Sequence, residues 1–184
     1  MALPWSPLSK AAQGIDALSK RCSLCAQKGI PANRKSFPLI SSEEFAQAKR
    51  SSIRLYAYAN RIVAILSKYL TDSKAVFALF NQDACLLKLY GQPDTLTELS
   101  QKGLCRMSDW QENSIGANAV SVGLTYNLPV AACGGDNYSS LLADFAVYFA
   151  PCALENDSGT SAPYVFGGIA LILPLEKSHP DYLM

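Results

Sequence analysis

Two long apolar segments near the end of the chain constrain its fold more than any other feature. They span residues 144–154 and 164–175, and the link between them begins Glu155-Asn156-Asp157-Ser158-Gly159. Polar, glycine-containing sequences of this kind form turns, so we expect the two segments to pair as long antiparallel strands. Strands with so many apolar residues need other elements to cover them, which predicts a layered domain of mixed type.

Shorter segments predict the rest of the sheet. Residues 75–80 and 85–90 are apolar and flank the turn sequence Asn81-Gln82-Asp83-Ala84, which indicates a β-hairpin. Residues 128–133 predict another strand, which Gly134-Gly135 ends. Helices are expected around residues 94–102 and 114–126. Five strands, mostly antiparallel, with helices gathered to one face make an α+β sandwich.

Two helical segments precede the sheet. Residues 9–28 predict a helix that Gly29 ends, and we assign residues 1–40 to an N-terminal helical extension and 41–184 to the main domain. Ser41 and Glu44 have the spacing of a capping box, so a helix is expected over residues 42–70. Its apolar residues recur at alternating four- and three-residue steps and predict a packing seam: Leu55, Ala59, Ile62, Leu66 and Tyr69.

Composition limits the function. The 184 residues are 49% hydrophobic and 17% charged, with a net charge of +1, which favours a folded domain over disorder. Such a balanced charge argues against a nucleic-acid-binding domain. No apolar run reaches the length of a membrane span, and the first twenty residues lack the apolar stretch of a signal peptide. We therefore expect a cytoplasmic protein that does not bind membranes.

Histidine and cysteine content narrows the chemistry. His179 is the single histidine, which argues against His-rich metal sites and most Ser–His or Cys–His catalysis. Cys22 and Cys25 form one Cys-x-x-Cys pair with no second pair to complete a zinc site, so packing is the expected role. We predict neither a metal nor a cofactor.

A segment in the middle of the chain resembles a known family. It reads Gly103-Leu104-Cys105-Arg106-Met107-Ser108-Asp109-Trp110-Gln111-Glu112-Asn113-Ser114-Ile115-Gly116-Ala117-Asn118-Ala119. This is similar to the signature of the GAF-type sensory domain at the N-terminus of sigma-54-dependent transcriptional activators of the acetoin-regulator kind. Further matches extend over nearly the whole chain: Arg21-Cys22 with Gly29-Ile30-Pro31, Pro129-Val130, Gly134-Gly135-Asp136-Asn137-Tyr138, Ala150-Pro151 and His179-Pro180.

The resemblance implies a fold and a function. The expected fold is a GAF-like central antiparallel sheet with helices packed on one side, preceded by the N-terminal helical extension, with a truncated last helix. The expected function is small-molecule sensing: the domain binds a small organic metabolite and signals through dimer helices. In the family, a central ATPase and a C-terminal DNA-binding domain follow. These 184 residues contain neither, so no direct nucleic-acid binding by this segment is expected.

The resemblance also implies where a ligand binds, because in a GAF fold the signature loop covers the ligand-binding face of the sheet. We predict a pocket between the sheet and residues 103–126, with Glu112 and Gly116 as structural residues of the motif. Few of the predicted wall residues are charged, which favours a neutral or weakly polar ligand. The walls are Phe77, Leu79, Cys105, Trp110, Asn118, Cys133, Asn137 and Tyr138.

The sequence departs from the family pattern at several polar positions. Ala117 replaces a threonine, Asp136-Asn137 replaces an acidic residue followed by histidine, and Ser19 replaces a tryptophan. The ligand of a relative therefore does not transfer to this chain.

Three alternatives remain open. First, the signature motif holds its loop in place without touching a ligand. Second, the chain is a thiol-dependent reductase of free methionine sulfoxide, a chemistry found in some GAF-fold enzymes, with Cys105 next to Arg106 as the candidate for a lowered thiol pKa. Third, the chain is a protein-interaction or dimerisation module with no small ligand.

Overall fold

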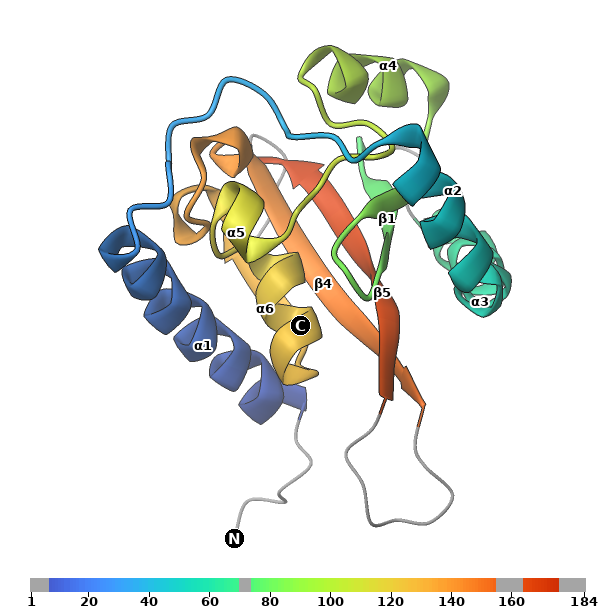
Figure 1. Ribbon diagram of the computed structural model, residues 1–184. Helices are drawn as coiled ribbons and strands as arrows, with labels where there is room; N and C mark the ends of the chain where they lie inside the picture. Colours follow the sequence, from blue (N-terminus) through green and yellow to red (C-terminus); the bar gives the residue numbers. More distant parts are fainter. Residues whose placement is uncertain (1–6, 70–73, 155–163, 176–184) are drawn as a thin grey trace, which may run out of the picture.

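A five-stranded antiparallel sheet lies between two groups of helices in the computed structural model, which describes residues 7–69, 74–154 and 164–175 (Figure 1). The strand order is β2-β1-β5-β4-β3. The strands are β1 (Val76–Asn81), β2 (Leu86–Tyr90), β3 (Val130–Cys133), β4 (Phe145–Leu154) and β5 (Tyr164–Pro174). The α-helices are α1 (Pro7–Gln27), α2 (Ser42–Ser51), α3 (Ile53–Leu66), α4 (Pro93–Gln101), α5 (Glu112–Ile115) and α6 (Ala119–Tyr126). The mixed α and β class with an antiparallel sheet is confirmed.

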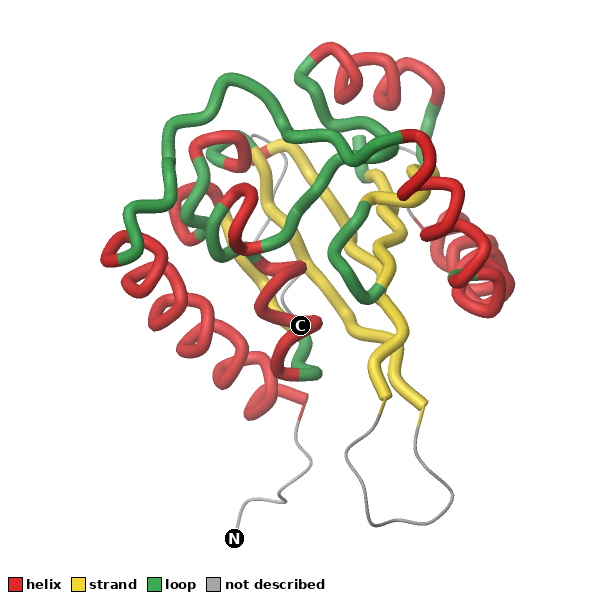
Figure 2. The backbone as a smooth tube through the Cα atoms, viewed as in Figure 1, coloured by secondary structure: helices red, strands yellow, loops and turns green. Residues whose placement is uncertain are grey.

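The two long apolar segments form the centre of the sheet, as the sequence predicts. Strands β4 and β5 pair antiparallel from Phe145 opposite Pro174 to Leu154 opposite Tyr164, and β1 pairs with the other side of β5. The loop that joins α1 to α2 runs over one end of the sheet (Figure 2). The turn expected at residues 155–159 and the match at His179-Pro180 lie outside the described residues.

Strands β1 and β2 form the second predicted hairpin. The side-chain oxygen of Asn81 accepts hydrogen bonds from the backbone N–H of Asp83 at 3.1 Å and of Cys85 at 2.8 Å. Ala84 takes the positive φ of 54° that closes the turn. An Asn side chain that accepts from the backbone N–H groups after it is a common way to form a tight turn, and the hairpin is confirmed.

Helices cover both faces of the sheet, so the prediction that they pack on one side is wrong. Phe80 of β1 belongs to the core cluster that contains α1, α5 and α6, whereas its neighbour Leu79 packs with Leu55 and Ala59 of α3. Successive side chains of a strand point to opposite faces, which accounts for the division. Every residue of β1 is buried. A strand buried on both faces has no polar alternation from which the covered face could be deduced.

The helix predicted over residues 42–70 is two helices. The capping box of Ser41 and Glu44 starts α2, as expected. The helix then ends at Ser51, whose hydroxyl donates to the carbonyl of Ala48 at 3.0 Å, and Ser52 separates α2 from α3. Serine side chains compete for backbone carbonyls in this way and so break a helix.

The packing seam of α3 is also displaced from the prediction. Leu55, Ala59 and Val63 are buried, whereas Ile62 and Leu66 are 39% and 40% exposed. The side chain of Tyr69 lies outside what the structure describes. The buried residues follow steps of four, so a stripe that includes Ile62 is left on the surface.

The helix predicted over residues 114–126 is likewise two helices. Gly116 ends α5 with φ 80° and ψ 178°, and Asn118 then starts α6 as its N-cap. A non-glycine residue rarely adopts that φ, so Gly116 fixes the break.

The predicted N-terminal extension packs into the main core. Leu18 and Cys25 of α1 are 2% and 0% exposed and belong to the same cluster as Phe80 and Trp110. Helix α1 lies along α6 and the edge strand β3 (Figure 1). The division at residue 40 stays a prediction, but the helix before it is a structural part of the sheet's cover.

Replacing Leu55 by alanine tests the cover that α3 provides. Leu55 is 1% exposed, and truncating such a residue costs about 2–5 kcal/mol of unfolding free energy. Ile53→Ala is the matched control, because Ile53 is 69% exposed and exposed substitutions change the unfolding free energy by about 0.5 kcal/mol or less. Urea unfolding followed by circular dichroism measures both. Equal losses would contradict packing of α3 on this face.

Candidate functional site

Asn118 holds the loop that carries the family resemblance, residues 110–118, which we call the motif loop. Its side-chain oxygen accepts from the backbone N–H of Val120 and Ser121 at 3.1 and 3.0 Å. Its amide nitrogen donates to the carbonyls of Trp110 and Gly116, both at 2.9 Å. These four bonds use both acceptor sites and both donors of the side chain. Buried Asn118 therefore has no hydrogen-bonding capacity left for a ligand.

Gly116 sits against Tyr138 from the next part of the chain. A Cβ atom at Gly116 would lie 2.1 Å from the Tyr138 ring, so no other residue fits. The Tyr138 hydroxyl donates to the carbonyl of Ile30 at 2.6 Å. Asn137 accepts from the N–H of Ala119 at 3.3 Å. Tyr138 thus joins the motif loop to the segment after α1, and Asn137 holds the start of α6.

Trp110 is a core residue in this structure. It is fully buried, stacked on Phe37 with ring centroids 5.3 Å apart and tilted against Phe80 at 5.0 Å. Its indole N–H has no hydrogen-bond partner among the described residues. Aromatic packing of this kind stabilises the loop.

Helix α1 is fixed to the motif loop by an ion pair. The Arg21 guanidinium donates to both carboxylate oxygens of Glu112, at 2.7 and 2.6 Å. The two side chains are 27% and 13% exposed, so the pair is shielded from much of the solvent. A bidentate Arg–carboxylate pair is among the strongest polar contacts in proteins, and it raises the pKa of Arg21.

The Cys-x-x-Cys pair extends the same contact. Cys25 Sγ accepts from the N–H of Ala117 at 3.3 Å, and Cys22 Sγ lies 3.5 Å from the carbonyl of Asp136. We call the contacts of Arg21, Cys22 and Cys25 with the loops they hold the α1 clamp. Burial raises the pKa of the Cys22 thiol to about 11 and also raises that of Cys25. Both are protonated thiols at neutral pH, in keeping with the packing role expected from the sequence.

The predicted wall residues do not surround one cavity. Leu79 faces α3, on the opposite side of the sheet from Trp110, and Phe77 lies two residues before it on the same face of β1. Cys133 is half-buried and belongs to a third cluster on β3, β4 and β5. Cys105 lines a cavity of about 440 Å³ with Lys49 and Arg106. Ligand binding by these residues stays a prediction.

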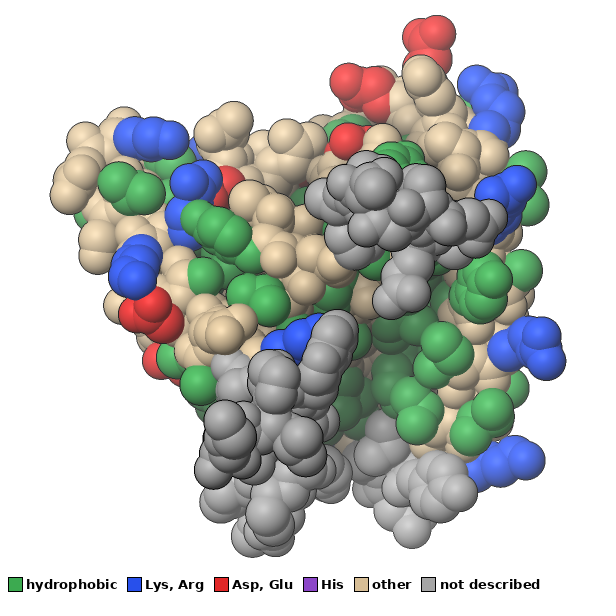
Figure 3. Space-filling view, turned by 90° about the horizontal axis from the view of Figure 1, so that it is seen from below, with side chains coloured by type: hydrophobic (Ala, Val, Ile, Leu, Met, Phe, Trp, Pro, Cys, Tyr) green, Lys and Arg blue, Asp and Glu red, His purple; other side chains and the backbone are tan. Residues whose placement is uncertain are grey.

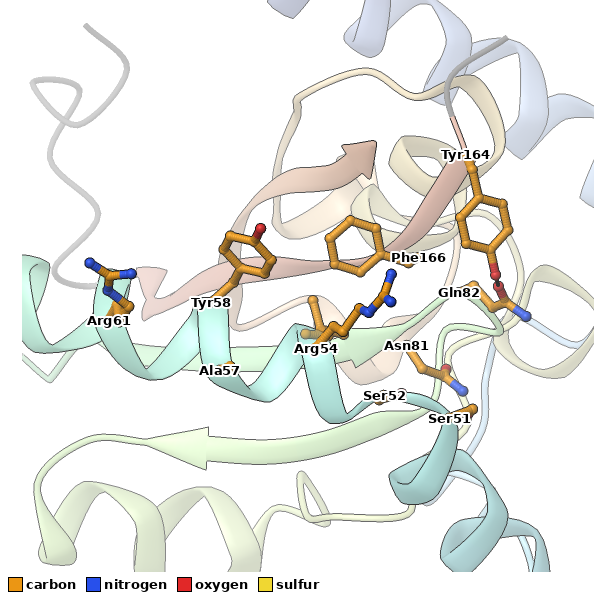
Figure 4. Close-up of a pocket in the computed structure, with 11 residues that line it drawn as sticks. Ser51, Ser52, Arg54, Ala57, Tyr58, Arg61, Asn81, Gln82, Tyr164 and Phe166 are labelled. Carbon is orange, nitrogen blue, oxygen red and sulfur yellow. Dashed lines mark hydrogen bonds between the residues drawn. The ribbon is translucent and has the colours of Figure 1, made fainter. Parts of the chain in front are cut away.

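A cavity with a volume of about 680 Å³ lies beside α3. We call it the α3 cavity. It lies between the first half of α3, the β1–β2 turn and the start of β5 (Figure 4). Viewed from below, hydrophobic side chains gather on this side of the molecule with Lys and Arg at its edge (Figure 3). The lining residues are Ser51, Ser52, Arg54, Leu55, Ala57, Tyr58, Arg61, Asn81, Gln82, Tyr164 and Phe166.

The lining of the α3 cavity combines arginine side chains, aromatic rings and hydrogen-bond donors. Tyr58 packs against Phe166 with ring centroids 6.2 Å apart. The Tyr164 hydroxyl donates to the side-chain oxygen of Gln82. Arg54 and Arg61 make no ion pair within residues 7–69, 74–154 and 164–175, and the lining contains no Asp or Glu.

This site was not predicted from the sequence, although part of its signal is readable there. Arg54, Tyr58 and Arg61 follow steps of four and three, which places them on one helix stripe. The contributions of Gln82 and Phe166 depend on the strand order and had no local signal.

Metal and membrane sites find no support in the described part of the chain. No cluster of three or more His, Cys, Asp or Glu side chains there has the geometry to hold a metal. None of the helices described is both long enough and apolar enough to cross a bilayer.

No protein-family model matches the chain. Over 153 residues it is 23% identical to the acetoin dehydrogenase operon transcriptional activator AcoR of Bacillus subtilis (strain 168). That match covers 83% of this chain and 24% of AcoR, so the chain spans about a quarter of the length of this curated relative. The chain is thus similar in sequence to part of a transcriptional activator.

A solved structure shares the fold. The chain superimposes on DhaR(N) in the crystal structure of the E. coli DhaR(N)–DhaL complex with a TM-score of 0.77 and 20% identity. The match covers 90% of this chain and 54% of that chain. It shows a common fold, which is consistent with a GAF-like arrangement.

Breaking the Arg21–Glu112 pair tests the α1 clamp. We expect Arg21→Gln to lower the free energy of unfolding by about 1–3 kcal/mol, because Glu112 loses two charge-assisted hydrogen bonds. Lys20→Gln is the matched control: its partner is Asp16, and the two side chains are 72% and 65% exposed. Solvent screens an exposed pair of this kind, so its loss should hardly change the stability. Chemical denaturation measures both, and an Arg21→Gln variant as stable as Lys20→Gln would refute the clamp.

Proposed function

We propose that this chain is a GAF-type regulatory sensing domain of a bacterial sigma-54-dependent transcriptional activator, which works in the cytoplasm and binds a small organic molecule. The observation that carries the proposal is the agreement of two comparisons over nearly the same chain. The sequence match to a transcriptional activator covers 83% of it, and the fold match to DhaR(N) covers 90%.

The α3 cavity supports small-molecule binding. Its volume of about 680 Å³ lies within the range of about 300–1,000 Å³ that ligand pockets occupy. The face of the sheet where the family resemblance places the ligand is covered by Trp110, Phe80 and the motif loop, and the cavity beside that loop is smaller, about 340 Å³. We therefore place the ligand beside α3.

Helix α3 also supports the proposed homodimer. It exposes Tyr58, Ile62, Ile65 and Leu66, which are 39–59% exposed and lie at steps of three and four residues along the helix. A group of exposed apolar residues marks an interaction surface in a protein of this size. We propose that α3 packs against the same helix of a second copy.

A protein partner is the second candidate function. DhaR(N) was crystallised with DhaL, so one chain of this fold binds another protein. The same apolar stripe on α3 offers a surface for such a partner. This reading predicts binding to a protein without a bound small molecule.

A thiol enzyme finds less support, and we propose that the domain is not an enzyme. Burial raises the pKa of the Cys85 thiol to about 12 and raises that of Cys152, and these groups stay protonated and unreactive at neutral pH. Cys105 is half-buried beside the Ser108 hydroxyl, with its sulfur 3.9 Å from that oxygen. Within the described residues, the Cys105 sulfur makes no hydrogen bond to a second cysteine or to an Asp or Glu side chain.

Native mass spectrometry of the freshly purified chain tests the proposal. We expect a dimer mass and an additional small mass that disappears on denaturation. Ile65→Glu places a charge in the proposed dimer surface and should give a monomer, whereas Ile53→Glu, on the other side of the helix, should remain dimeric. A monomeric parent chain that carries nothing and binds none of a broad metabolite library would contradict both the ligand and the dimer.

A further inference from the structure

We propose that the α3 cavity binds an aromatic carboxylate, with Arg54 holding the carboxylate and the rings of Tyr58 and Phe166 contacting the aromatic body. This inference rests on the proposed function and names the class of ligand for it. It departs from the neutral ligand expected from the sequence, because the cavity found in the structure has different walls.

The charges of the cavity favour an anion. Arg54 and Arg61 both line it, and no acidic residue does. Neither arginine pairs with a carboxylate elsewhere in the described chain. The two positions are seven residues apart, about 10 Å along a helix, so they line the cavity at two different levels. Arg54 is the nearer to Phe166, and Arg61 stands one turn beyond Tyr58 (Figure 4).

The hydrogen-bonding groups of the cavity favour a ligand that carries acceptor atoms. The side-chain oxygen of Asn81 is occupied by two backbone N–H groups, and that of Gln82 by the Tyr164 hydroxyl. The Tyr58 hydroxyl has no partner among the described residues and remains available to donate. The Asn81 amide nitrogen is also used, since it donates to the Asp83 carboxylate at 3.2 Å. With both amide oxygens occupied, the Tyr58 hydroxyl and the two arginines remain as donors, and they match a ligand that brings acceptors, which a carboxylate does.

The aromatic rings of the cavity favour a ligand with a flat apolar part. Tyr58 and Phe166 lie 6.2 Å apart at an angle of 50°, and Leu55 and Ala57 add aliphatic surface beside them. Aromatic groups prefer offset or tilted contacts with other rings. An arginine beside rings also binds planar carboxylates well, because its guanidinium is itself planar. A compact phosphate would leave this apolar wall without a contact.

The position of the cavity connects binding to the rest of α3. Arg54, Tyr58 and Arg61 share a helix stripe with Ile65, which belongs to the proposed dimer surface. A ligand held between this stripe and Phe166 of β5 contacts the helix and the sheet together. Its occupancy therefore favours one packing of α3 over another, which is what a sensor requires.

Isothermal titration calorimetry with 1-naphthoate as the probe tests the inference. We expect binding to the parent chain, and a dissociation constant at least about tenfold higher for Arg54→Gln, the usual loss when a charged hydrogen bond is removed. Arg50→Gln is the matched control: it also removes one exposed arginine, but Arg50 does not line the cavity. It should bind as the parent does.

Two further titrations separate charge from shape and carboxylate from phosphate. The neutral 1-naphthamide should bind at least about tenfold more weakly than 1-naphthoate, since it cannot form the charge-assisted pair. Inorganic phosphate should compete weakly. Equal binding of the amide, equal binding by Arg54→Gln, or full displacement by phosphate would each overturn the inference.

The failures of the two proposals are distinguishable. If native mass spectrometry finds a small molecule whose binding Arg54→Gln leaves unchanged, the sensing function stands and the site assigned here is wrong. If the chain binds only a protein, the sensing function itself fails. Circular dichroism of each variant shows whether it folds, and Arg54→Lys restores the charge and should recover part of the affinity.

Discussion

The bidentate contact between Arg21 and Glu112 organises this molecule. It holds α1 against the motif loop at 2.6–2.7 Å, and the sulfurs of Cys22 and Cys25 support the same loop from the same helix. With α1 in place, Trp110 is enclosed and the face of the sheet beneath α1, α5 and α6 is covered. Two side chains 91 residues apart in sequence thus fix α1 over this face of the sheet, and the α3 cavity lies on the opposite face.

Local sequence signals predicted the elements of the fold better than their packing. Turn chemistry at Asn81 and the long apolar segments around residues 155–163 are local, so both hairpins were predictable. The helix breaks at Ser52 and Gly116 were missed, because each depends on a single residue within an otherwise helical pattern. The faces of the sheet were also missed, since β1 is apolar at nearly every position and fully buried.

The position of the candidate site was harder to predict from the sequence than the elements of the fold. The family resemblance drew attention to Trp110, Asn118 and Tyr138, and the structure places all three in contacts that hold the fold together. The α3 cavity instead gathers side chains from three distant segments, none of which has an unusual sequence. A sequence motif predicts a local backbone geometry more readily than a ligand contact. Closely packed residues tolerate fewer substitutions than residues that line an open cavity. The position of a site therefore required the strand order as well as the motif.

Hydrogen–deuterium exchange of the chain with and without 1-naphthoate measures most directly on which face the ligand binds. The structure predicts slower exchange in residues 53–61 and 164–168, which flank the α3 cavity, and no change in residues 103–126. Protection confined to residues 103–126 would contradict this account. It would show that the motif loop opens to admit a ligand on the front of the sheet, where the α1 clamp holds it closed in the present structure.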